Sequence, residues 1–131
     1  SMFDSEKLDP DVKMPTTTDY KEFTIHHYKR IVKHKTSFYT YHCPLAMGAL
    51  VAGSYLPNGC SVDNKLVENA AMLMGEYFQI QDDVLDCFAD PAVLGKIGTD
   101  IQDTKCSWLA VTFLGNATPQ QIETFKAHYG K

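Results

Sequence analysis

Apolar side chains recur at helical spacing along most of the chain, and no segment shows the convincing alternation of a strand. The pattern predicts a helix from about 19 to 33, because Asp19 and Glu22 have the spacing of a capping box. It predicts a second, buried helix over 34–56, bent near Pro44 because proline lacks the backbone donor of a helix. The fold class that this pattern indicates is all-α.

The remaining pattern predicts three further helices, separated by segments rich in turn residues. After residue 56 we expect a turn at 57–59, a helix at 63–88, a loop at 91–98, a helix capped at Thr99 whose apolar part is 108–114, and a last helix from Thr118 to Tyr129. Residues 3–18 are polar and contain two prolines, and we expect them to form an extended lead-in.

The long helix over 63–88 has two contrasting faces. With Gln79 as the reference, the carboxylates of Asp82, Asp83 and Asp86 lie within about 60° of it on a helix of about 100° per residue. The opposite arc carries Met74, Tyr77, Phe78, Ile80, Val84, Leu85 and Phe88. Like charges one turn apart destabilise a helix by roughly 0.2–0.5 kcal/mol, so the strip suggests either an external cation or a solvated face. For a cation, such oxygen ligands suit Mg²⁺, which tends to bridge carboxylates to phosphates.

A lysine between two glycines follows the carboxylate strip at Lys96, and Asp100, Asp103 and Lys105 come soon after it. If carboxylates hold Mg²⁺ and the metal grips phosphate oxygens, a nearby lysine adds a compact positive charge. The helix and the lysine segment would then form complementary halves of a diphosphate site. The alternatives are an ordinary exposed lysine and two acids at a helix start, where the dipole favours them.

Lys35 and Thr36 lie at the junction of the first two predicted helices, beside the aromatic residues Phe38, Tyr39 and Tyr41. A lysine and a hydroxyl in this position would be suited to contacting phosphate, with the aromatic residues lining an apolar channel. The alternative is a surface lysine next to aromatic residues of the core.

Composition restricts the possible classes of protein. The chain has 131 residues, 44% hydrophobic and 21% charged, as expected of one globular domain. Its net charge of −4 argues against nonspecific nucleic-acid binding, which needs a basic surface. Four cysteines without CxxC spacing indicate free thiols of a reducing compartment, and we expect a cytoplasmic protein. No apolar run reaches the roughly 18 residues of a membrane span.

Two segments closely resemble one family of enzymes. Phe78-Gln-Ile-Gln-Asp-Asp-x-x-Asp86, followed by 95–108, resembles the second aspartate-rich region of eukaryotic farnesyl diphosphate synthases, and 28–39 resembles the segment upstream of it. The resemblance implies the all-α isoprenoid synthase (prenyltransferase) fold, with residues 1–131 forming part of a polyprenyl synthase domain. It also implies a homodimer that joins dimethylallyl or geranyl diphosphate to isopentenyl diphosphate, giving farnesyl diphosphate.

The resemblance assigns roles to particular residues. It implies three Mg²⁺ ions in a complete active site, with Asp82 as a direct ligand and Asp83, Asp86 and Asp100 in support. The residues expected to hold the diphosphate, or a bisphosphonate inhibitor that mimics it, are Lys35, Lys96 and Lys105. The residues expected beside the allylic carbon, where positive charge develops, are Thr36, Tyr39 and Gln79.

The chain also departs from the family pattern. It lacks the first aspartate-rich motif, the Gly-Lys-x-x-Arg segment and the arginines expected to bind isopentenyl diphosphate. We therefore expect a fragment that supplies one half-site and is inactive alone. A geranyl or geranylgeranyl diphosphate synthase, or a non-catalytic helical binding or regulatory module of the same fold, remain as alternatives.

Overall fold

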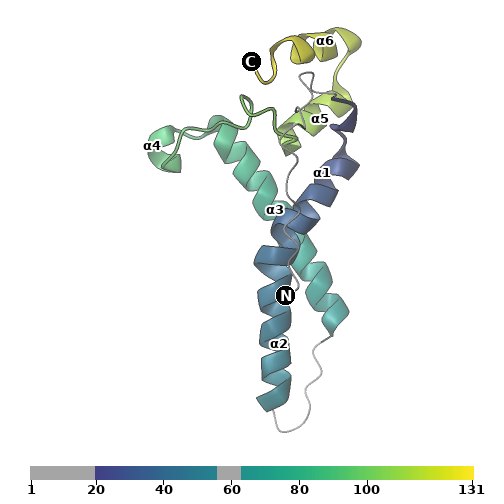
Figure 1. Cartoon of the computed structure of the whole chain (residues 1–131), viewed down its shortest axis with the longest axis vertical. Helices are drawn as coiled ribbons and strands as arrows, with labels where there is room; N and C mark the ends of the chain where they lie inside the picture. The colour runs from purple at the N-terminus through teal and green to yellow at the C-terminus, as the bar shows by residue number, and fades with distance from the viewer. Residues whose placement is uncertain (1–19, 56–62) are drawn as a thin grey trace, which may run out of the picture.

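The computed structural model describes residues 20–55 and 63–131, and within these ranges every regular element is a helix. Figure 1 shows their arrangement. In chain order they are the 3₁₀ turn η1 (Tyr20–Glu22), α1 (Ile25–Val32), the π-helix η2 (Lys33–His42), α2 (Cys43–Tyr55), α3 (Asn64–Phe88), α4 (Pro91–Leu94), α5 (Trp108–Asn116) and α6 (Pro119–His128). The predicted all-α class is confirmed. None of the described helices is both long and apolar enough to span a bilayer.

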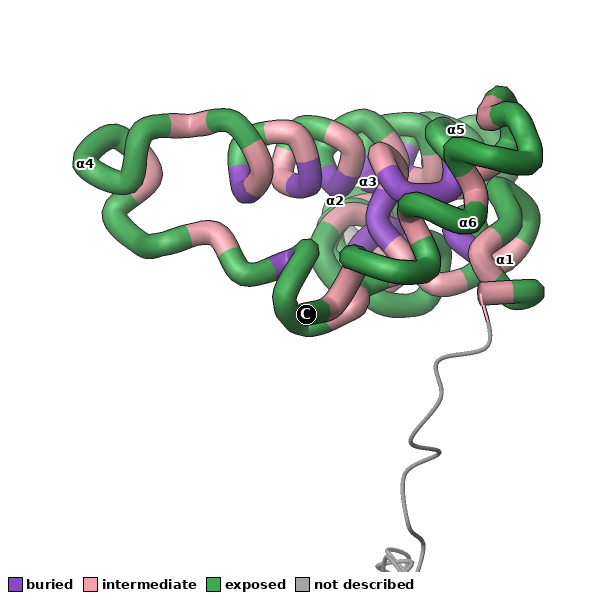
Figure 2. The backbone as a smooth tube through the Cα atoms, turned by 90° about the horizontal axis from the view of Figure 1, so that it is seen from above, coloured by how far each residue is buried: buried purple, intermediate pink, exposed green. Residues whose placement is uncertain are grey.

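The helices are organised around one crossing. α1, η2 and α2 follow one another without a break, and this rod crosses α3 near the middle of the molecule (Figure 1). The principal contact at the crossing is between η2 and α3, while α5 packs against both α1 and α3. α4 lies away from these helices, and the segment after it returns toward α5, passing the end of α3 (Figure 2). The buried residues therefore gather around α3, η2, α1 and α5.

The start of the first helix differs from the prediction. Thr24, in an extended conformation, caps α1 by accepting a hydrogen bond from the backbone N–H of His27, 3.1 Å away. Glu22 lies in the preceding 3₁₀ turn, and Asp19 lies outside the described residues. The capping box expected from Asp19 and Glu22 is therefore not the start of α1, because the cap that directly precedes the helix is Thr24.

The second predicted helix also differs in its form. Between α1 and Pro44 the chain is π-helical, and the N–H of Cys43 bonds to the carbonyl of Phe38, five residues earlier. The disturbance of regular α-helix thus lies upstream of Pro44, which falls in the first turn of α2, where proline is tolerated. π-helical segments are rare in proteins, and those that occur are often found at functional sites.

The expectation that residues 34–56 are buried is wrong for most of the described part. Leu45, Met47, Leu50 and Val51 of α2 are 44–70% exposed. Apart from η2, to which it is joined, α2 packs mainly against α3, so most of its circumference faces no described element. The apolar composition of α2 therefore does not mean that the helix is buried within the described part of this chain.

α3 has the predicted boundaries but buries its polar face. Asp63 caps it by accepting from the N–H groups of Lys65 and Leu66, and the helix ends at Phe88. Its buried residues lie along one line: Ala71, Gly75, Gln79, Asp83 and Asp86. The opposite arc is exposed, including Leu73, Met74, Tyr77, Phe78, Leu85 and Phe88. The usual relation between amphipathic pattern and burial is therefore inverted in α3.

Two clusters of side chains hold the helices together. Tyr28, Val32 and Val111 form the buried core between α1 and α5, surrounded by Phe23, Ile80, Cys106 and Trp108. An aromatic cluster then joins the two ends of the described chain through edge and stacked contacts between Tyr20, Phe23, Phe113, Phe125 and Tyr129. The hydroxyl of Tyr20 donates to the carbonyl of Tyr129 at 2.9 Å. α6 is thereby fixed against the start of α1.

We predicted a loop over 91–98, and this is wrong for its first part. Pro91–Leu94 form the single helical turn α4. Asp90 caps this turn by accepting from the N–H of Ala92, and proline at the first position favours a helix start. Gly95 ends it in the left-handed region, at φ 75°.

The prediction of a helix cap at Thr99 is wrong. The Thr99 hydroxyl donates to the carboxylate of Asp103 within a turn, and α5 begins at Trp108, capped by Ser107. The capping box between Thr118 and Gln121 is confirmed, and it opens α6.

A close approach between η2 and α3, at Gly75 and Ser37, allows a test of the crossing. A Cβ on Gly75 would lie 2.2 Å from Ser37 Oγ and 2.5 Å from Ser37 Cα, so Gly75→Ala must push the two helices apart. We expect it to lower the free energy of unfolding by about 1–3 kcal/mol. Urea unfolding followed by circular dichroism measures this change. The matched control is Gly48→Ala in α2, where a Cβ meets nothing within 4 Å, and which should stabilise by about 0.5–1 kcal/mol. Equal effects of the two variants would contradict the close packing.

Candidate functional site

A buried hydrogen-bond network lies where η2, α3 and α5 meet. The Thr36 hydroxyl donates to Gln79 Oε1 at 2.7 Å, and Gln79 Nε2 donates to Asp83 Oδ1 at 3.0 Å. The other oxygen of Asp83 accepts from the backbone N–H of Trp108 at 2.6 Å. Thr36, Gln79 and Asp83 are at most 7% exposed. Because buried polar groups must be paired, this network fixes the relative positions of three helices.

The first aspartate of the strip has a different environment. Asp82 is half-buried, and its described contact is one hydrogen bond, accepted by Oδ2 from Gln79 Nε2 at 3.2 Å. Asp83 is engaged at both oxygens and is buried. Of these two neighbouring carboxylates, Asp82 is therefore the one with an oxygen, Oδ1, that has no described partner.

The third aspartate of the strip binds the lysine segment. Asp86 Oδ2 accepts from the backbone N–H of Asp100 at 2.9 Å, and Asp86 Oδ1 lies 3.2 Å from Lys96 Nζ. Gly98 passes so close that a Cβ there would lie 1.8 Å from the Asp86 carbonyl oxygen. The close approach that only glycine permits brings Lys96 to the end of the carboxylate strip.

A second acid–lysine pair lies beside the first. The buried Asp100 forms an ion pair with Lys105, whose carbonyl accepts from the Tyr129 hydroxyl at 2.7 Å. Thr104, just before this lysine, has a φ of 54°, which is uncommon for a residue other than glycine. A Cβ on Gly130 would lie 2.0 Å from the Thr104 hydroxyl. The end of α6 therefore supports the turn that presents Lys105.

The surroundings shift the ionisation of these groups in opposite directions. Burial favours the neutral form of Asp86, but the hydrogen bond from Asp100 and the charge of Lys96 outweigh it and lower its pKa. Burial raises the pKa of Asp100 despite its ion pair, and the hydrogen bond to Asp100 raises the pKa of Lys105. At neutral pH the Asp86 and Lys105 side chains are therefore firmly charged.

Tyr28 lies in the apolar core near Asp83 and was not singled out from the sequence. Tyr28 is 2% exposed, and its hydroxyl has no hydrogen-bond partner of standard geometry. Burial and the charge of Asp83 raise the pKa of Tyr28 above its usual value. In the sequence, the helical spacing from Tyr28 to Val32 indicates only a core residue. Nothing in that spacing reveals that Asp83 lies near the Tyr28 hydroxyl.

The predicted site residues do not all join the network. The structure brings together Thr36, Gln79, Asp82, Asp83, Asp86, Lys96, Asp100 and Lys105. Lys35 is exposed and Tyr39 is 80% exposed, and neither has a described contact with these residues. The sequence missed the backbone N–H of Trp108, because a main-chain donor leaves no signature in the residue types.

Within the described ranges no group of three or more His, Cys, Asp or Glu side chains is already arranged to enclose a metal ion. Asp83 and Asp86 are engaged at both oxygens, and Asp100 is buried and paired with Lys105. Asp82 is half-buried with one described hydrogen bond, at Oδ2, so its Oδ1 is the most available oxygen donor. Such a donor set fits Mg²⁺, which usually keeps several waters and binds through one or two carboxylates plus phosphates. It does not fit a dedicated protein cage.

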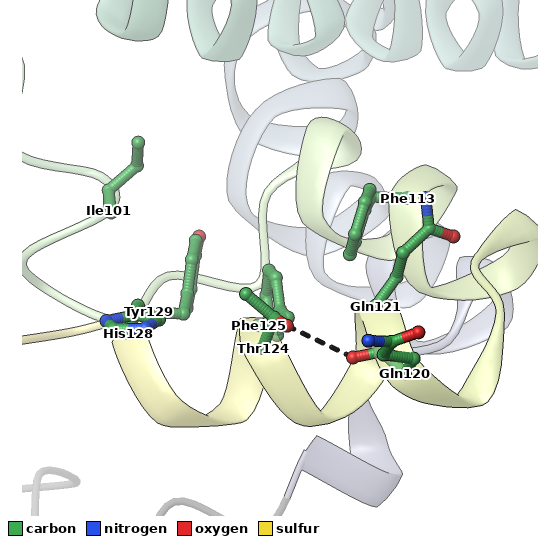
Figure 3. Close-up of a pocket in the computed structure, with 8 residues that line it drawn as sticks. All are labelled: Ile101, Phe113, Gln120, Gln121, Thr124, Phe125, His128 and Tyr129. Atoms are coloured by element: carbon green, nitrogen blue, oxygen red, sulfur yellow. Dashed lines mark hydrogen bonds between the residues drawn. The ribbon is translucent and has the colours of Figure 1, made fainter.

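Two cavities adjoin this site on the side of α5 and α6. One of about 500 Å³ lies between α5, α6 and the segment before Lys105, and Figure 3 shows its lining: Ile101, Phe113, Gln120, Gln121, Thr124, Phe125, His128 and Tyr129. A smaller one of about 260 Å³ shares the aromatic residues of this wall and reaches Asp83 and Asp100. The larger cavity contains no carboxylate and no lysine, so it is unsuited to a metal-bound diphosphate.

The lowered pKa of Asp86 gives a pH-dependent prediction for the metal-free protein. Asp86→Asn removes the ion pair with Lys96, so we expect a loss of about 1–2 kcal/mol in the free energy of unfolding at pH 7. A carboxyl with a lowered folded pKa stabilises above its unfolded pKa of about 3.9, and this stabilisation is lost as the pH falls through the folded value. The difference between variant and parent should therefore shrink below about pH 4.

Urea unfolding in EDTA, repeated from pH 7 to pH 2, measures this difference. Asp90→Asn is the matched control, because asparagine caps a helix as well as aspartate does and should change stability little at any pH. An Asp86→Asn difference that stays constant across the range would contradict the assignment.

Comparison with known proteins places this geometry in a family. The polyprenyl synthetase family model matches residues 5–131. Curated farnesyl pyrophosphate synthases from Gallus gallus and Homo sapiens are 48% and 49% identical to the chain over 117 and 113 residues. Each match covers 86% of this chain but only 30% and 26% of those relatives.

Solved structures agree in fold as well as in sequence. T. brucei farnesyl diphosphate synthase complexed with minodronate has a TM-score of 0.82 and 63% identity, over 99% of this chain and 34% of that one. Unliganded T. brucei FPPS has a TM-score of 0.78 and 61% identity, over 86% of this chain and 33% of that one. The chain thus spans about a third of the length of the proteins that it matches. It belongs to the polyprenyl synthetase family.

Proposed function

We propose that the chain is the part of a farnesyl diphosphate synthase that supplies the second Mg²⁺–diphosphate half-site for prenyl transfer. The observation that carries this proposal is the meeting of the carboxylate strip with two lysines. Gly98 brings Lys96 to Asp86, and the following turn brings Lys105 to Asp100. A half-site for a metal-bound diphosphate needs both charges within a few ångströms.

In this proposal Asp82 holds Mg²⁺ directly, while Asp83, Asp86 and Asp100 support it through hydrogen bonds and water. Bound Mg²⁺ would neutralise charge that develops on the diphosphate as the allylic C–O bond breaks. A cation bound beside these carboxylates would offset the negative charge of Asp86 and Asp100. Their ion pairs with Lys96 and Lys105 would then be weaker. The lysine ammonium groups would then turn to the diphosphate oxygens.

The other end of the site would face the hydrocarbon part of the substrate. Thr36 and Gln79 present hydroxyl and amide dipoles at the buried junction of η2 and α3, next to Asp82. Fixed dipoles in a site from which water is excluded stabilise the positive charge of the allylic cation. Lys35 and Tyr39 are exposed in this chain, and we propose that they contribute to binding once the remainder of the active site covers them.

The named relatives favour this reading over its alternatives. They are farnesyl diphosphate synthases, rather than enzymes named for geranyl or geranylgeranyl diphosphate. The paired acids and lysines favour an enzyme over a non-catalytic module of the same fold. Several of the solved T. brucei structures are complexes with bisphosphonates, and we propose that this chain takes part in binding the same class of inhibitor.

The assembly and the compartment of the proposed enzyme stay predictions. The homodimer follows from the family resemblance. The cytoplasmic location follows from unpaired cysteines, and Cys43, Cys87 and Cys106 are free thiols while Cys60 lies outside the described residues. One relative, from Arabidopsis thaliana, is named as mitochondrial, so similarity to these relatives does not by itself imply a cytoplasmic location.

Bisphosphonate binding tests the proposed half-site in a full-length synthase that contains this chain. Calorimetric titration should show tight binding with Mg²⁺ and a large loss of affinity in EDTA. Asp82→Asn should weaken the Mg²⁺-dependent binding by roughly 10–100-fold, because it removes the direct ligand. Glu68→Gln is the matched control: it changes a carboxylate on the same helix, about 21 Å away, and should change affinity by less than about twofold. Equal binding with and without Mg²⁺ would refute the half-site.

The isolated chain gives a second test. With Mg²⁺, geranyl diphosphate and isopentenyl diphosphate, the 131-residue chain should form no farnesyl diphosphate above background. The physical reason is that the chain contains one set of metal-binding carboxylates, and the arginines expected for isopentenyl diphosphate are missing from its sequence. Radiolabelled isopentenyl diphosphate detects product sensitively, and the full-length enzyme serves as the positive control. Product formation by the chain alone would show that the half-site description is wrong.

A further inference from the structure

The environment of Asp83 does not suit a direct metal ligand. Both of its oxygens are occupied, Oδ1 by Gln79 Nε2 and Oδ2 by the backbone N–H of Trp108, and the residue is 4% exposed. Trp108 is the first residue of α5, so its N–H has no partner within the helix. Turning Asp83 toward a cation would leave this buried donor unpaired, which is unfavourable.

Asp83 and Asp82 together determine how the side-chain amide of Gln79 is oriented. Carboxylates accept hydrogen bonds and do not donate them, so the nitrogen of the amide must face the two aspartates. The reverse orientation would direct the carbonyl oxygen of Gln79 at two negative charges. Oε1 consequently faces Thr36.

The orientation of Gln79 in turn determines the polarity of Thr36. A hydroxyl has one proton, and Thr36 donates it to Gln79 Oε1 at 2.7 Å. Any further group that approaches Thr36 Oγ1 therefore meets only lone pairs. The hydroxyl is held as an acceptor, which is the polarity that stabilises positive charge and repels negative charge.

We propose that Asp83 is a positioning residue: through the amide of Gln79 it holds the Thr36 hydroxyl as an acceptor toward the cationic part of the substrate. Its anchor is the N-terminus of α5, where the N–H of Trp108 and the helix dipole both favour a carboxylate. Asp82, half-buried and with one described hydrogen bond, is left to bind the metal. This inference rests on the proposed function, because it needs the allylic group to lie next to Thr36.

Asp83→Asn should reverse this polarity while preserving the shape of the side chain. The carbonyl oxygen of the new amide must accept from Trp108, so its NH₂ group faces Gln79 and meets another NH₂ group. Inversion of the Gln79 amide removes this conflict at the cost of its hydrogen bond to Asp82, whose charge bound Mg²⁺ would offset in the proposed site. The NH₂ group of Gln79 then donates to Thr36. The Thr36 proton is released and points into the site, where it disfavours a cation.

The test compares two bisphosphonates of the same shape, bound to a full-length synthase in saturating Mg²⁺. One carries a cationic nitrogen in its side chain, and the other has a neutral carbon in that place. The unsubstituted protein should prefer the cationic probe. Asp83→Asn should reduce this preference roughly tenfold, as expected for one charge-assisted hydrogen bond. The affinity for the neutral probe should change by less than about threefold.

Asp82→Asn and two variants of Thr36 are the controls. Asp82→Asn should weaken both probes to the same extent and raise the Mg²⁺ concentration that is needed. Thr36→Ser should keep the preference for the cationic probe, and Thr36→Val should abolish it. An Asp83→Asn protein that behaves like Asp82→Asn would overturn the inference, because Asp83 would then act on the metal. If neither probe binds the unsubstituted protein, the proposed function itself fails, and the inference fails with it.

A measurement on the unsubstituted protein covers the case in which Asp83→Asn does not fold. In ¹⁵N-glutamine-labelled protein, the side-chain amide protons of Gln79 should exchange slowly with solvent, because both are held by buried or half-buried carboxylates. Gln120, which is exposed at the edge of the cavity in Figure 3 and has no described side-chain hydrogen bond, is the internal reference and should exchange fast. Exchange of Gln79 as fast as that of Gln120 would overturn the inference.

Discussion

The hydrogen bond from Trp108 N–H to Asp83 is the interaction on which the other parts of the site depend. It places a buried carboxylate at the start of α5, and through Gln79 the same carboxylate reaches Thr36 on η2. In this series of hydrogen bonds each group is paired with the next one. The loss of any single bond therefore leaves a buried polar group unpaired. Three helices are therefore held in register by polar contacts, with only a small apolar core beside them.

This arrangement explains why α3 buries its polar face. The line from Gly75 to Asp86 faces η2, α5 and the lysine segment, while large apolar residues such as Tyr77 and Phe88 are at least 70% exposed. Exposed apolar surface of this extent marks an interface. Relatives are about three times as long as this chain, so the proposed enzyme contains a remainder large enough to cover this arc.

The sequence predicted those features that depend on local pattern. The bounds of about 63 and 88 for α3 were predicted, and Thr118 with Gln121 predicted the start of α6, because a capping box acts within one turn. That Asp63 caps α3 is seen in the structure. The start of α5 was missed since Thr99 and Ser107 are both good caps, and tertiary contacts choose between them. The burial of α2 and the face that α3 presents were missed because periodicity states where apolar residues lie and not what covers them.

The site shows the same division between local and tertiary information. One residue along a helix is a rotation of about 100°, so Asp82 and Asp83 necessarily face different surroundings. Asp86 lies between them, about 40° from Asp82 and about 60° from Asp83, so the helix angle alone does not decide its surroundings. Asp83 and Asp86 both accept from main-chain N–H groups of the segments that follow α3. The motif spacing identifies three carboxylates on one strip, but it does not make them equivalent. Which of them is free to bind a cation depends on the donors that the rest of the chain directs at each, and in this fold Asp82 receives the fewest.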